Sequence, residues 1–314
     1  MNATRKFVFA VMMCCGFSNV VRAAPPITAA AFAPDGSAVV VGSQSGIEVR
    51  SWPDLKSERR LTTQLEHVHD VSFSPSGDTL AAAGGAPAES GCVELFRWPS
   101  GEPLARHKLA DDVIFRVAWR PNGEAFSIAA ADRSVVLLGR DGGILQRFAG
   151  HSRGVTAVAF LPAGDRLISG GLDQSLRLWN AANGELLRTF DNHTSAVNDV
   201  AVRPKHETAP PLIATAGADR TVRFWQPTIG RLVRFARLPS EPLAVAWTPD
   251  GRTALAVCRD GQLCGIDPDS AEIIWKKPVL AGWAYTLAIS PDGHYALVGG
   301  EAGELQALRL PNRN

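Results

Sequence analysis

The sequence has almost no net charge and no long apolar run, and each absence excludes a class of protein. Its 32 Lys and Arg residues balance 31 Asp and Glu residues, so the formal charge is only +1. A near-neutral chain is unsuited to coating nucleic acid or an anionic membrane, and we expect neither nucleic acid nor stable membrane insertion. The uncharged stretch at residues 7–21 is too short for a membrane-spanning helix, which needs about 20 residues.

Motifs that carry catalysis or hold a cofactor are also missing. The chain has no Cys-x-x-Cys pair, no Gly-x-Ser-x-Gly nucleophile elbow and no phosphate-binding loop. The best candidate for a metal site is the pair His67 and His69, which share one face of a strand. A zinc site needs further ligands, and the sequence specifies none. We therefore expect no enzyme activity, no cofactor and no metal.

The first 23 residues have the pattern of a secretory signal peptide. Arg5 and Lys6 precede a short apolar region, and the residues at 21–23 favour cleavage after Ala23. The alternative is a retained membrane anchor. The pattern predicts a leader at residues 1–23, a single domain at residues 24–314, and export to the periplasm or the extracellular space.

Three cysteines follow the leader: Cys92, Cys258 and Cys264. The last two flank an Arg-Asp-Gly turn, and an exported protein can oxidise such a pair. A two-residue turn at 260–261 places Cys258 opposite Leu263 and sets the two sulfur atoms on opposite faces of the hairpin. A longer loop or a bulge would bring them together. We expect buried thiols.

What the sequence does contain is an internal repeat. A Pro-x-Gly turn, preceded by a short apolar alternation, recurs at intervals of 41 to 46 residues. The prolines of the seven units are Pro34, Pro75, Pro121, Pro162, Pro204, Pro249 and Pro291. Only the unit of Pro204 lacks the glycine. The seven units fill residues 27–314 with nothing left over.

Each unit has the pattern of short β-strands. In the fourth unit, the predicted strands are 155–160, 166–169, 175–179 and 185–190, separated by Gly, Pro, Asn and Asp. No helical apolar stripe occurs outside the leader. Repeats of this kind must stack around an axis to bury their faces. The sequence therefore predicts an all-β, seven-bladed β-propeller of four-stranded antiparallel blades, with surface loops at the insertions 84–90 and 205–211.

In its fourth and fifth units the chain resembles the WD40-repeat β-propellers. The fourth unit begins at Gly150-His151 and ends at Trp179, and the fifth begins at Asn192-His193 and ends at Trp225. In this family a histidine, a hydroxyl residue, an aspartate and the tryptophan form a hydrogen-bonded tetrad, which satisfies polar groups that are costly to bury unpaired. The resemblance implies two structural tetrads: His151, Ser169, Asp173 and Trp179 in one blade, and His193, Thr215, Asp219 and Trp225 in the next.

The other five units depart from this motif. At the tryptophan position they have Ser51, Phe96, Leu138, Ile266 and Leu308, so we expect packing to replace the tetrad. The seventh unit ends after its third strand, and propellers of this family commonly close with an outer strand from one terminus. Blade 7 is predicted to be three-stranded with an exposed edge (Glu304, Gln306, Arg309), or closed by a partner's strand. Residues 17–22 would fill that edge if the leader were retained.

The repeat also aligns residues at the rim where each first strand begins, which is the usual docking face of this family. Eight or six positions before the prolines lie His67, His69, Phe115, Glu241, Trp283 and Tyr285. Those of blades 2, 3 and 7 are expected in one sector, and clustered aromatic residues are typical of an interaction hot spot. Alternatively, Phe115 and Tyr285 pack between blades. The five arginines between Arg220 and Arg237 are interpreted as a solvated outer face.

The favoured hypothesis is a non-enzymatic scaffold that docks a protein partner on the rim and is monomeric unless the blade 7 edge pairs. A closed ring of sheets holds its loops at fixed positions, which lowers the entropic cost of docking. Two alternatives stay open. One is an accessory subunit of an exported redox or hydrolytic enzyme, and the other is a small-molecule or metal site at the mouth of the central channel.

Overall fold

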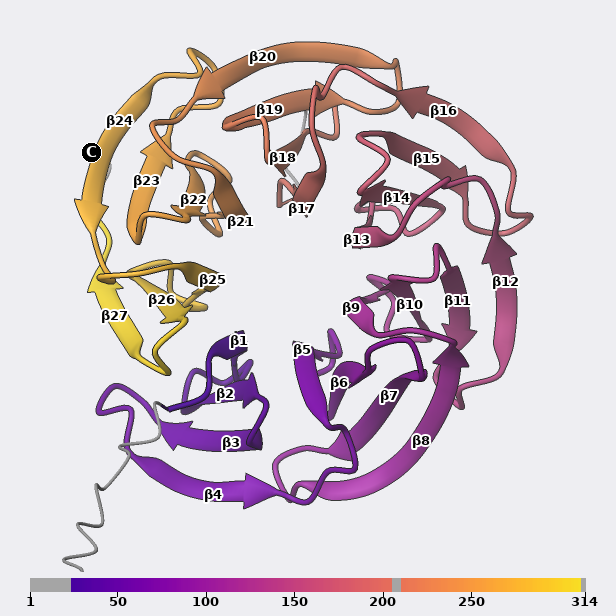
Figure 1. The fold of residues 1–314 in the computed structure, drawn as a ribbon, viewed down its shortest axis with the longest axis vertical. Helices are drawn as coiled ribbons and strands as arrows, with labels where there is room; N and C mark the ends of the chain where they lie inside the picture. The colour runs from indigo at the N-terminus through magenta and orange to yellow at the C-terminus, as the bar shows by residue number, and fades with distance from the viewer. Residues whose placement is uncertain (1–23, 205–209, 312–314) are drawn as a thin grey trace, which may run out of the picture.

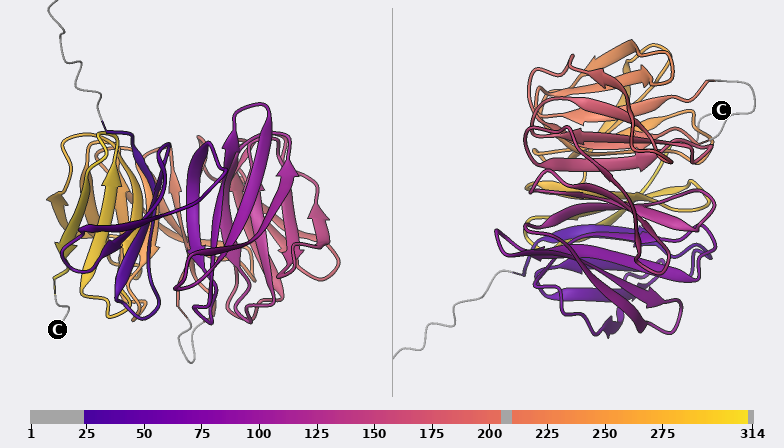
Figure 2. Two further views of the ribbon diagram at one scale, coloured as in Figure 1. Left: turned by 90° about the horizontal axis from the view of Figure 1, so that it is seen from below. Right: turned by 90° about the vertical axis from the view of Figure 1, so that its right-hand side faces the viewer.

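Seven small β-sheets surround a central axis in a computed structural model that describes residues 24–204 and 210–311 (Figure 1). Six sheets have four antiparallel strands and the seventh has three, which confirms the predicted all-β, seven-bladed propeller. The blades stack face to face into a disc (Figure 2). Within the described ranges no helix is long and apolar enough to span a membrane.

Each blade runs outward from the axis in chain order. The innermost strands are β1 (Ile27–Phe32), β5 (His67–Phe73), β9 (Ile114–Trp119), β13 (Val155–Phe160), β17 (Val197–Val202), β21 (Pro242–Trp247) and β25 (Ala284–Ile289). The second strands are β2 (Ala38–Ser43), β6 (Thr79–Ala86), β10 (Ala125–Ala130), β14 (Arg166–Gly171), β18 (Ile213–Gly217), β22 (Ala254–Cys258) and β26 (Tyr295–Gly300). The third strands are β3 (Gly46–Ser51), β7 (Ser90–Arg97), β11 (Val135–Gly139), β15 (Leu176–Asn180), β19 (Thr221–Gln226), β23 (Gln262–Ile266) and β27 (Leu305–Arg309). The fourth strands are β4 (Ser57–Leu61), β8 (Glu102–Ala110), β12 (Ile144–Phe148), β16 (Leu186–Phe190), β20 (Arg231–Arg237) and β24 (Ile273–Pro278).

The core lies between the blades. Every residue of β6 and β10 is buried, because the second strands are covered by sheet neighbours at both edges and by blades on both faces. Aromatic pairs join adjacent blades, as where the rings of Phe224 and Trp247 lie 5.8 Å apart between blades 5 and 6. The fourth strands are mostly exposed, because they form the circumference of the disc.

A β-bulge near the start of every innermost strand sets the shape of the rim. The residue left out of the ladder is Thr28, His69, Phe115, Thr156, Asn198, Leu243 or Tyr285, in order of blades. Each lies six positions before the proline of its repeat. Because a bulge twists a strand and redirects a side chain, the seven residues form a ring at the end where the inner strands begin.

The insertion in blade 2 does not form the predicted loop. Instead, β6 extends to Ala86 and β7 begins at Ser90, so the extra residues lengthen a hairpin. Gly84 permits this extension, because a Cβ there would lie only 1.8 Å from the carbonyl oxygen of His67. The other predicted loop falls largely on residues 205–209, which lie outside the described ranges.

The tryptophan position of blade 1 is held by Arg50, and the assignment to Ser51 is wrong by one residue. In blade 4, Leu167 pairs with Trp179, whereas in blade 1 the equivalent Val39 pairs with Arg50. The Arg50 guanidinium bonds Glu48 at 2.8 Å. A salt bridge on β3 thus stands where blades 2 to 6 bury an apolar or indole side chain.

The hairpin that carries two of the cysteines also differs from its predicted register. Val257, and not Cys258, pairs with Leu263. Gly261 adopts a positive φ of 74°, which closes a three-residue turn and shifts the pairing by one residue. Cys258 and Cys264 therefore share one face, and both are free and buried in the core between blades 5 and 6. The thiol of Cys264 and burial together raise the pKa of Cys258.

Blade 7 lacks the cover that a fourth strand gives the other blades. Six third-strand residues at one repeat position are at most 1% exposed: Ile47, Val93, Val135, Leu176, Val222 and Leu263. Leu305, the equivalent residue of β27, is only half-buried. Residues 17–22, which the sequence offers as an alternative strand for this edge, lie outside the described ranges.

This open edge predicts fast hydrogen exchange along β27. Its outward amides have no strand to bond within the described residues, whereas those of β15 and β19 are bonded on both sides. We expect the β27 amides to exchange at least about 10-fold faster than those of β15 and β19. Mass spectrometry of the exchanged chain measures this. Equal protection of the three strands would mean that something covers the edge.

Candidate functional site

Five side chains from blades 5, 6 and 7 form a connected group at the rim. The amide of Asn198 donates to Glu241 Oε1 at 3.0 Å, and Arg259 Nη1 lies 3.3 Å from Glu241 Oε2. The Arg259 guanidinium stacks on Trp283, 3.8 Å from the ring centroid. Trp283 in turn meets Tyr285 edge to face, with centroids 5.9 Å apart. We call Asn198, Glu241, Arg259, Trp283 and Tyr285 the rim cluster.

The contacts of the rim cluster hold it in one arrangement while leaving it accessible. The side chain of Arg259 is 48% exposed and that of Glu241 is 22% exposed. A guanidinium over an indole is worth about 0.5–2 kcal/mol. Burial and the carboxylate of Glu301 raise the pKa of Tyr285, so its hydroxyl remains a hydrogen-bond donor. The cluster therefore offers a cation, a carboxylate and a phenol beside an aromatic surface.

Sequence reasoning missed Arg259 and Glu301. Both lie ten positions after the proline of their repeat, in the turn that follows the second strand. The Arg259 amide donates to the carbonyl of Glu241 at 2.8 Å, and the Glu301 amide donates to that of Trp283 at 3.0 Å. The shared offset of ten residues from the proline is therefore the sequence signal that marks this position.

The predicted rim residues of blades 2 and 3 form a separate row. His69 lies between His67, at a centroid distance of 6.4 Å, and Phe115, at 5.6 Å. Burial and the neighbouring His67 lower the pKa of His69. Within the described ranges no contact joins this row to Trp283 or Tyr285, because blade 1 lies between them. The same ranges hold no group of three or more His, Cys, Asp or Glu side chains that could bind a metal ion.

Three charged side chains meet at the axis, below the ring of bulges. Asp70, Arg116 and Asp199 lie five positions before their prolines, on β5, β9 and β17. Arg116 Nη1 lies 3.5 Å from Asp70 Oδ1, and its Nη2 contacts Asp199 Oδ1. We call these three residues the axial triad.

The axial triad also bonds the backbone of neighbouring blades. Asp70 accepts the amide of Val117 at 2.9 Å, and Asp199 accepts that of Val245 at 3.0 Å. Burial raises the pKa of Asp70 to about 6, although Arg116 opposes this shift. The triad thus clamps blades 2, 3, 5 and 6 together.

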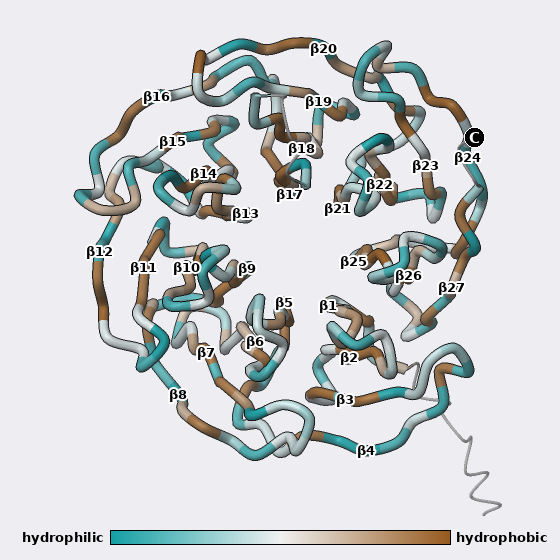
Figure 3. Tube along the Cα trace, turned by 180° about the vertical axis from the view of Figure 1, so that it is seen from behind, coloured by the Kyte–Doolittle hydropathy of each residue, from teal (hydrophilic) through white to brown (hydrophobic). Residues whose placement is uncertain are grey.

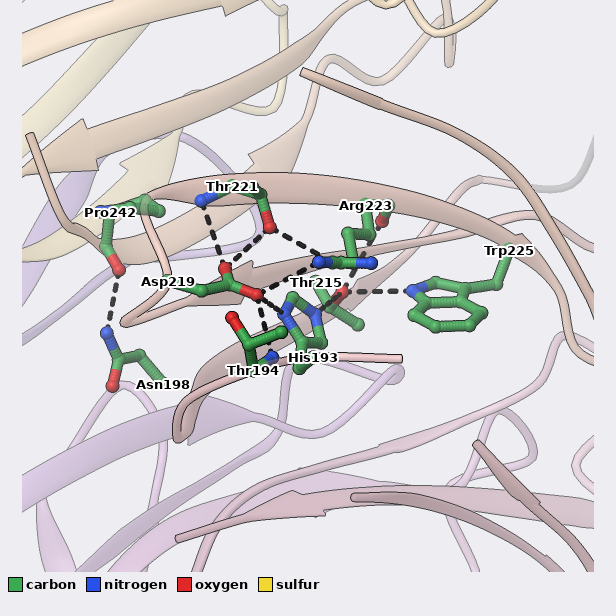
Figure 4. Close-up of polar contacts among 9 residues, drawn as sticks. All are labelled: His193, Thr194, Asn198, Thr215, Asp219, Thr221, Arg223, Trp225 and Pro242. Atoms are coloured by element: carbon green, nitrogen blue, oxygen red, sulfur yellow. Dashed lines mark hydrogen bonds and ion pairs between the residues drawn. The ribbon is translucent and has the colours of Figure 1, made fainter. Parts of the chain in front are cut away.

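In blade 5, four polar side chains form a continuous hydrogen-bonded chain (Figure 4). His193 Nδ1 lies 2.9 Å from Asp219, and its Nε2 lies 2.8 Å from the hydroxyl of Thr215. That hydroxyl accepts the indole N–H of Trp225 at 3.0 Å. Burial lowers the pKa of His193, so the ring is neutral at pH 7. Burial acts to raise the pKa of Asp219, but its interactions with Thr221 and His193 outweigh this and lower the pKa to about 2.

Blade 4 repeats this arrangement with residues of a catalytic type. His151 lies 2.9 Å from Asp173 and 2.8 Å from the hydroxyl of Ser169. Serine, histidine and aspartate in this order resemble a hydrolytic triad. However, Ser169 is 0% exposed, and its oxygen accepts the indole N–H of Trp179 at 2.9 Å. The hydroxyl is therefore out of reach of a substrate, and the group locks strands together.

Two regions of the chain match a known family model. The model, described as "WD domain, G-beta repeat", matches residues 142–180 and 184–226, which contain the two tetrad tryptophans.

Three similar curated proteins carry the name of the same subunit of one factor. Eukaryotic translation initiation factor 3 subunit I of Pyricularia oryzae is 32% identical over 163 residues, or 46% of this chain and 47% of the relative. The same subunit of Aspergillus terreus is 33% identical over 175 residues, or 50% and 49% of the two chains. That of Neurospora crassa is 30% identical over 178 residues, or 50% of each. The chain spans about half the length of the curated relatives it matches.

These relatives contradict the predicted export. The pattern of residues 1–23 predicts a signal peptide and a periplasmic or secreted protein, whereas the relatives are subunits of a translation initiation factor. The predictions of a signal peptide and of export are therefore wrong, and the alternative of an accessory subunit for an exported enzyme falls with them. The prediction rested only on the composition of residues 1–23, where basic residues precede a short apolar run. The fold of the propeller does not determine in which compartment the protein is located. Residues 1–23 themselves lie outside the described ranges.

The architecture and the family model agree over the region that the model matches. Seven radial antiparallel sheets surround one axis. Each matched region covers the outer strand of one blade and the three inner strands of the next: β12 to β15 in the first region and β16 to β19 in the second. The protein is a seven-bladed β-propeller, and its residues 142–180 and 184–226 are WD40 repeats.

Proposed function

We propose that this propeller, residues 24–314, is a non-enzymatic scaffold that docks a protein partner on its rim cluster. The observation that carries the proposal is the chain of contacts from Asn198 through Glu241 and Arg259 to Trp283 and Tyr285. Trp283 and Tyr285 are partly exposed and Arg259 is exposed, and accessible aromatic and arginine side chains that are already held in place are typical of interface hot spots. Holding them in the free protein lowers the entropy lost on docking.

The relatives support the same role. They are named as a subunit of a factor, and a subunit works by contacting other chains. We propose that this chain likewise belongs to a multi-subunit assembly and that its partner is a protein and not a nucleic acid. The buried polar groups of blades 4 and 5 support a non-enzymatic role, because each is already bonded to another buried group.

The double variant Trp283→Ala/Tyr285→Ala tests this proposal. With a partner captured from a whole-cell extract and then purified, we expect the variant to bind at least about 30-fold more weakly than the unmodified protein, since hot-spot truncations remove 2 kcal/mol or more. Isothermal titration calorimetry measures both affinities.

A second tryptophan–tyrosine pair provides the matched control. Trp52 and Tyr295 meet edge to face at 5.1 Å, at the opposite end of the blades from the rim, and both are half-buried. Trp52→Ala/Tyr295→Ala removes the same atoms and should leave the affinity unchanged if the variant is folded by circular dichroism. Equal losses in the two variants would contradict docking on the rim.

A further inference from the structure

Charge is unevenly distributed between the layers of the propeller. The outermost strand of each blade is β4, β8, β12, β16, β20, β24 or β27. Their basic residues are Arg59, Arg60, Arg106, Lys108, Arg147, Arg188, Arg231, Arg234, Arg237, Lys276, Lys277 and Arg309. Their only acidic residues are Glu58 and Glu102. Since the whole chain is near neutral, the circumference is selectively basic.

The strand β20 has the greatest concentration of unpaired cations. Arg231, Arg234 and Arg237 are exposed, and none makes an ion pair within the described ranges. Arginines elsewhere on the surface do find carboxylates, as Arg97 does with Glu102 at 2.9 Å. No acidic residue lies on β20 itself. Arginine remains charged at any physiological pH, so the three side chains form a permanent positive strip.

The same strand has a free edge. In the sheet order β17-β18-β19-β20, no strand of the described ranges pairs with the outer side of β20 (Figure 1). Arg231 and Arg234 lie on one face of the sheet, opposite Gln226 and Phe224, while Arg237 lies on the other face, opposite Thr221. Cations therefore flank the edge on both faces, where a strand placed alongside would project its own side chains.

Apolar contact area accompanies the charge. Two apolar residues separate each arginine of β20 from the next, so hydrophilic and hydrophobic segments follow one another along the strand (Figure 3). Among these apolar residues, Phe235 is 48% exposed. The guanidinium of Arg223 lies 5.4 Å from the centroid of the Phe235 ring and is itself held by Asp219 at 3.1 Å. The exposed ring thus rests on a group anchored in the tetrad of blade 5.

We propose that the free edge of β20 binds an acidic, extended polypeptide segment as a fifth strand of blade 5. Backbone hydrogen bonds along the edge supply affinity in this mode, and opposite charges across the strands set register. A second copy of the chain does not fit, because two basic edges repel. Single-stranded nucleic acid is disfavoured, because it stacks on aromatic platforms, and Phe235 is the one aromatic residue of β20. This surface lies on the circumference and is independent of docking on the rim.

Binding of a labelled acidic peptide of alternating Glu and Val tests the proposal. We expect the triple variant Arg231→Gln/Arg234→Gln/Arg237→Gln to bind this peptide at least about 10-fold more weakly at low salt. The control Arg147→Gln/Lys277→Gln/Arg309→Gln removes the same charge from three other outer strands and should bind within about 2-fold of the unmodified protein. Equal losses in both triples would overturn the proposal, as would failure of the unmodified protein to bind.

Two further readouts identify the mode and the class of ligand. If the peptide adds a strand, hydrogen exchange of the β20 amides should slow on binding, and unchanged exchange would overturn strand addition. An oligouridine RNA of matched charge should bind more weakly than the peptide. Tighter binding of the RNA, lost in the β20 triple variant, would assign the strip to nucleic acid and overturn the proposal.

Discussion

Replacing Arg116 with methionine will destabilise the propeller by about 3–5 kcal/mol, because the change leaves two buried carboxylates without their shared cation. Asp70 and Asp199 are 8% and 4% exposed and approach each other only through the Arg116 guanidinium. Methionine keeps most of the side-chain volume of arginine. The decrease in the free energy of unfolding therefore comes from the lost charge and not from a cavity. Urea unfolding at pH 7 measures it.

The matched control for this prediction neutralises the whole axial triad. In Asp70→Asn/Arg116→Met/Asp199→Asn the amide oxygens can still accept the backbone N–H groups of Val117 and Val245. Replacing every member of a buried ionic group is often neutral or stabilising. We therefore expect the triple variant to recover most of the stability lost in the single variant. A single variant within about 1 kcal/mol of the unmodified protein would show that the triad is not a clamp.

The pH dependence of the single variant has a definite sign. The pKa of Asp70 in the folded protein is already raised to about 6 by burial, against 3.8 as its ordinary value. A carboxyl group whose pKa is higher in the folded state makes folding less favourable as pH rises from the lower value to the higher one. Without Arg116 the pKa of Asp70 rises further, so the destabilisation should be larger at pH 8 than at pH 5.

Replacing Ser169 with alanine will destabilise the protein by about 2–4 kcal/mol, because it leaves two buried groups without partners. The hydroxyl of Ser169 accepts the indole N–H of Trp179 and bonds Nε2 of His151. Both partners are buried, so neither can turn to solvent. Thermal and urea unfolding measure the change.

Blade 3 provides a matched control for the loss of a buried hydroxyl. Ser127 is also 0% exposed, but its hydroxyl has no hydrogen-bond partner within the described ranges. Ser127→Ala removes the same atom and should be neutral or slightly stabilising, because no partner is left unpaired. Equal effects of Ser169→Ala and Ser127→Ala would contradict the view that the tetrad stabilises its blade.

The repeat made the fold predictable, because local turns and apolar alternation at a constant spacing leave few architectures. What it could not show was which side chains meet once the ring closes. Asp70, Arg116 and Asp199 each lie five positions before the proline of their repeat. Arg116 nevertheless contacts Asp199 of blade 5 only because the closed ring brings blades 3 and 5 together across the axis. In blade 1 the sequence predicted Ser51 at the tryptophan position, whereas the structure has Arg50 there. A difference of one residue in a turn is enough to change which side chain faces the core.

The rim was predicted in part. His69, Phe115 and Tyr285 share a bulge position that the spacing found, because bulges recur with the repeat. Arg259 was missed, because it lies in the turn after the second strand of blade 6 and reaches Trp283 across the boundary with blade 7. The export prediction failed for a different reason, since it rested on composition alone.

Photo-crosslinking from the rim tests the central claim most directly. A photoreactive residue at Leu243, which shares the bulge ring with Asn198 and Tyr285, should crosslink one specific protein in living cells. The same residue at Tyr295, at the opposite end of the blades, should crosslink no partner or a different one. If both positions yield the same protein equally, or if Leu243 yields none, the rim is not the docking face.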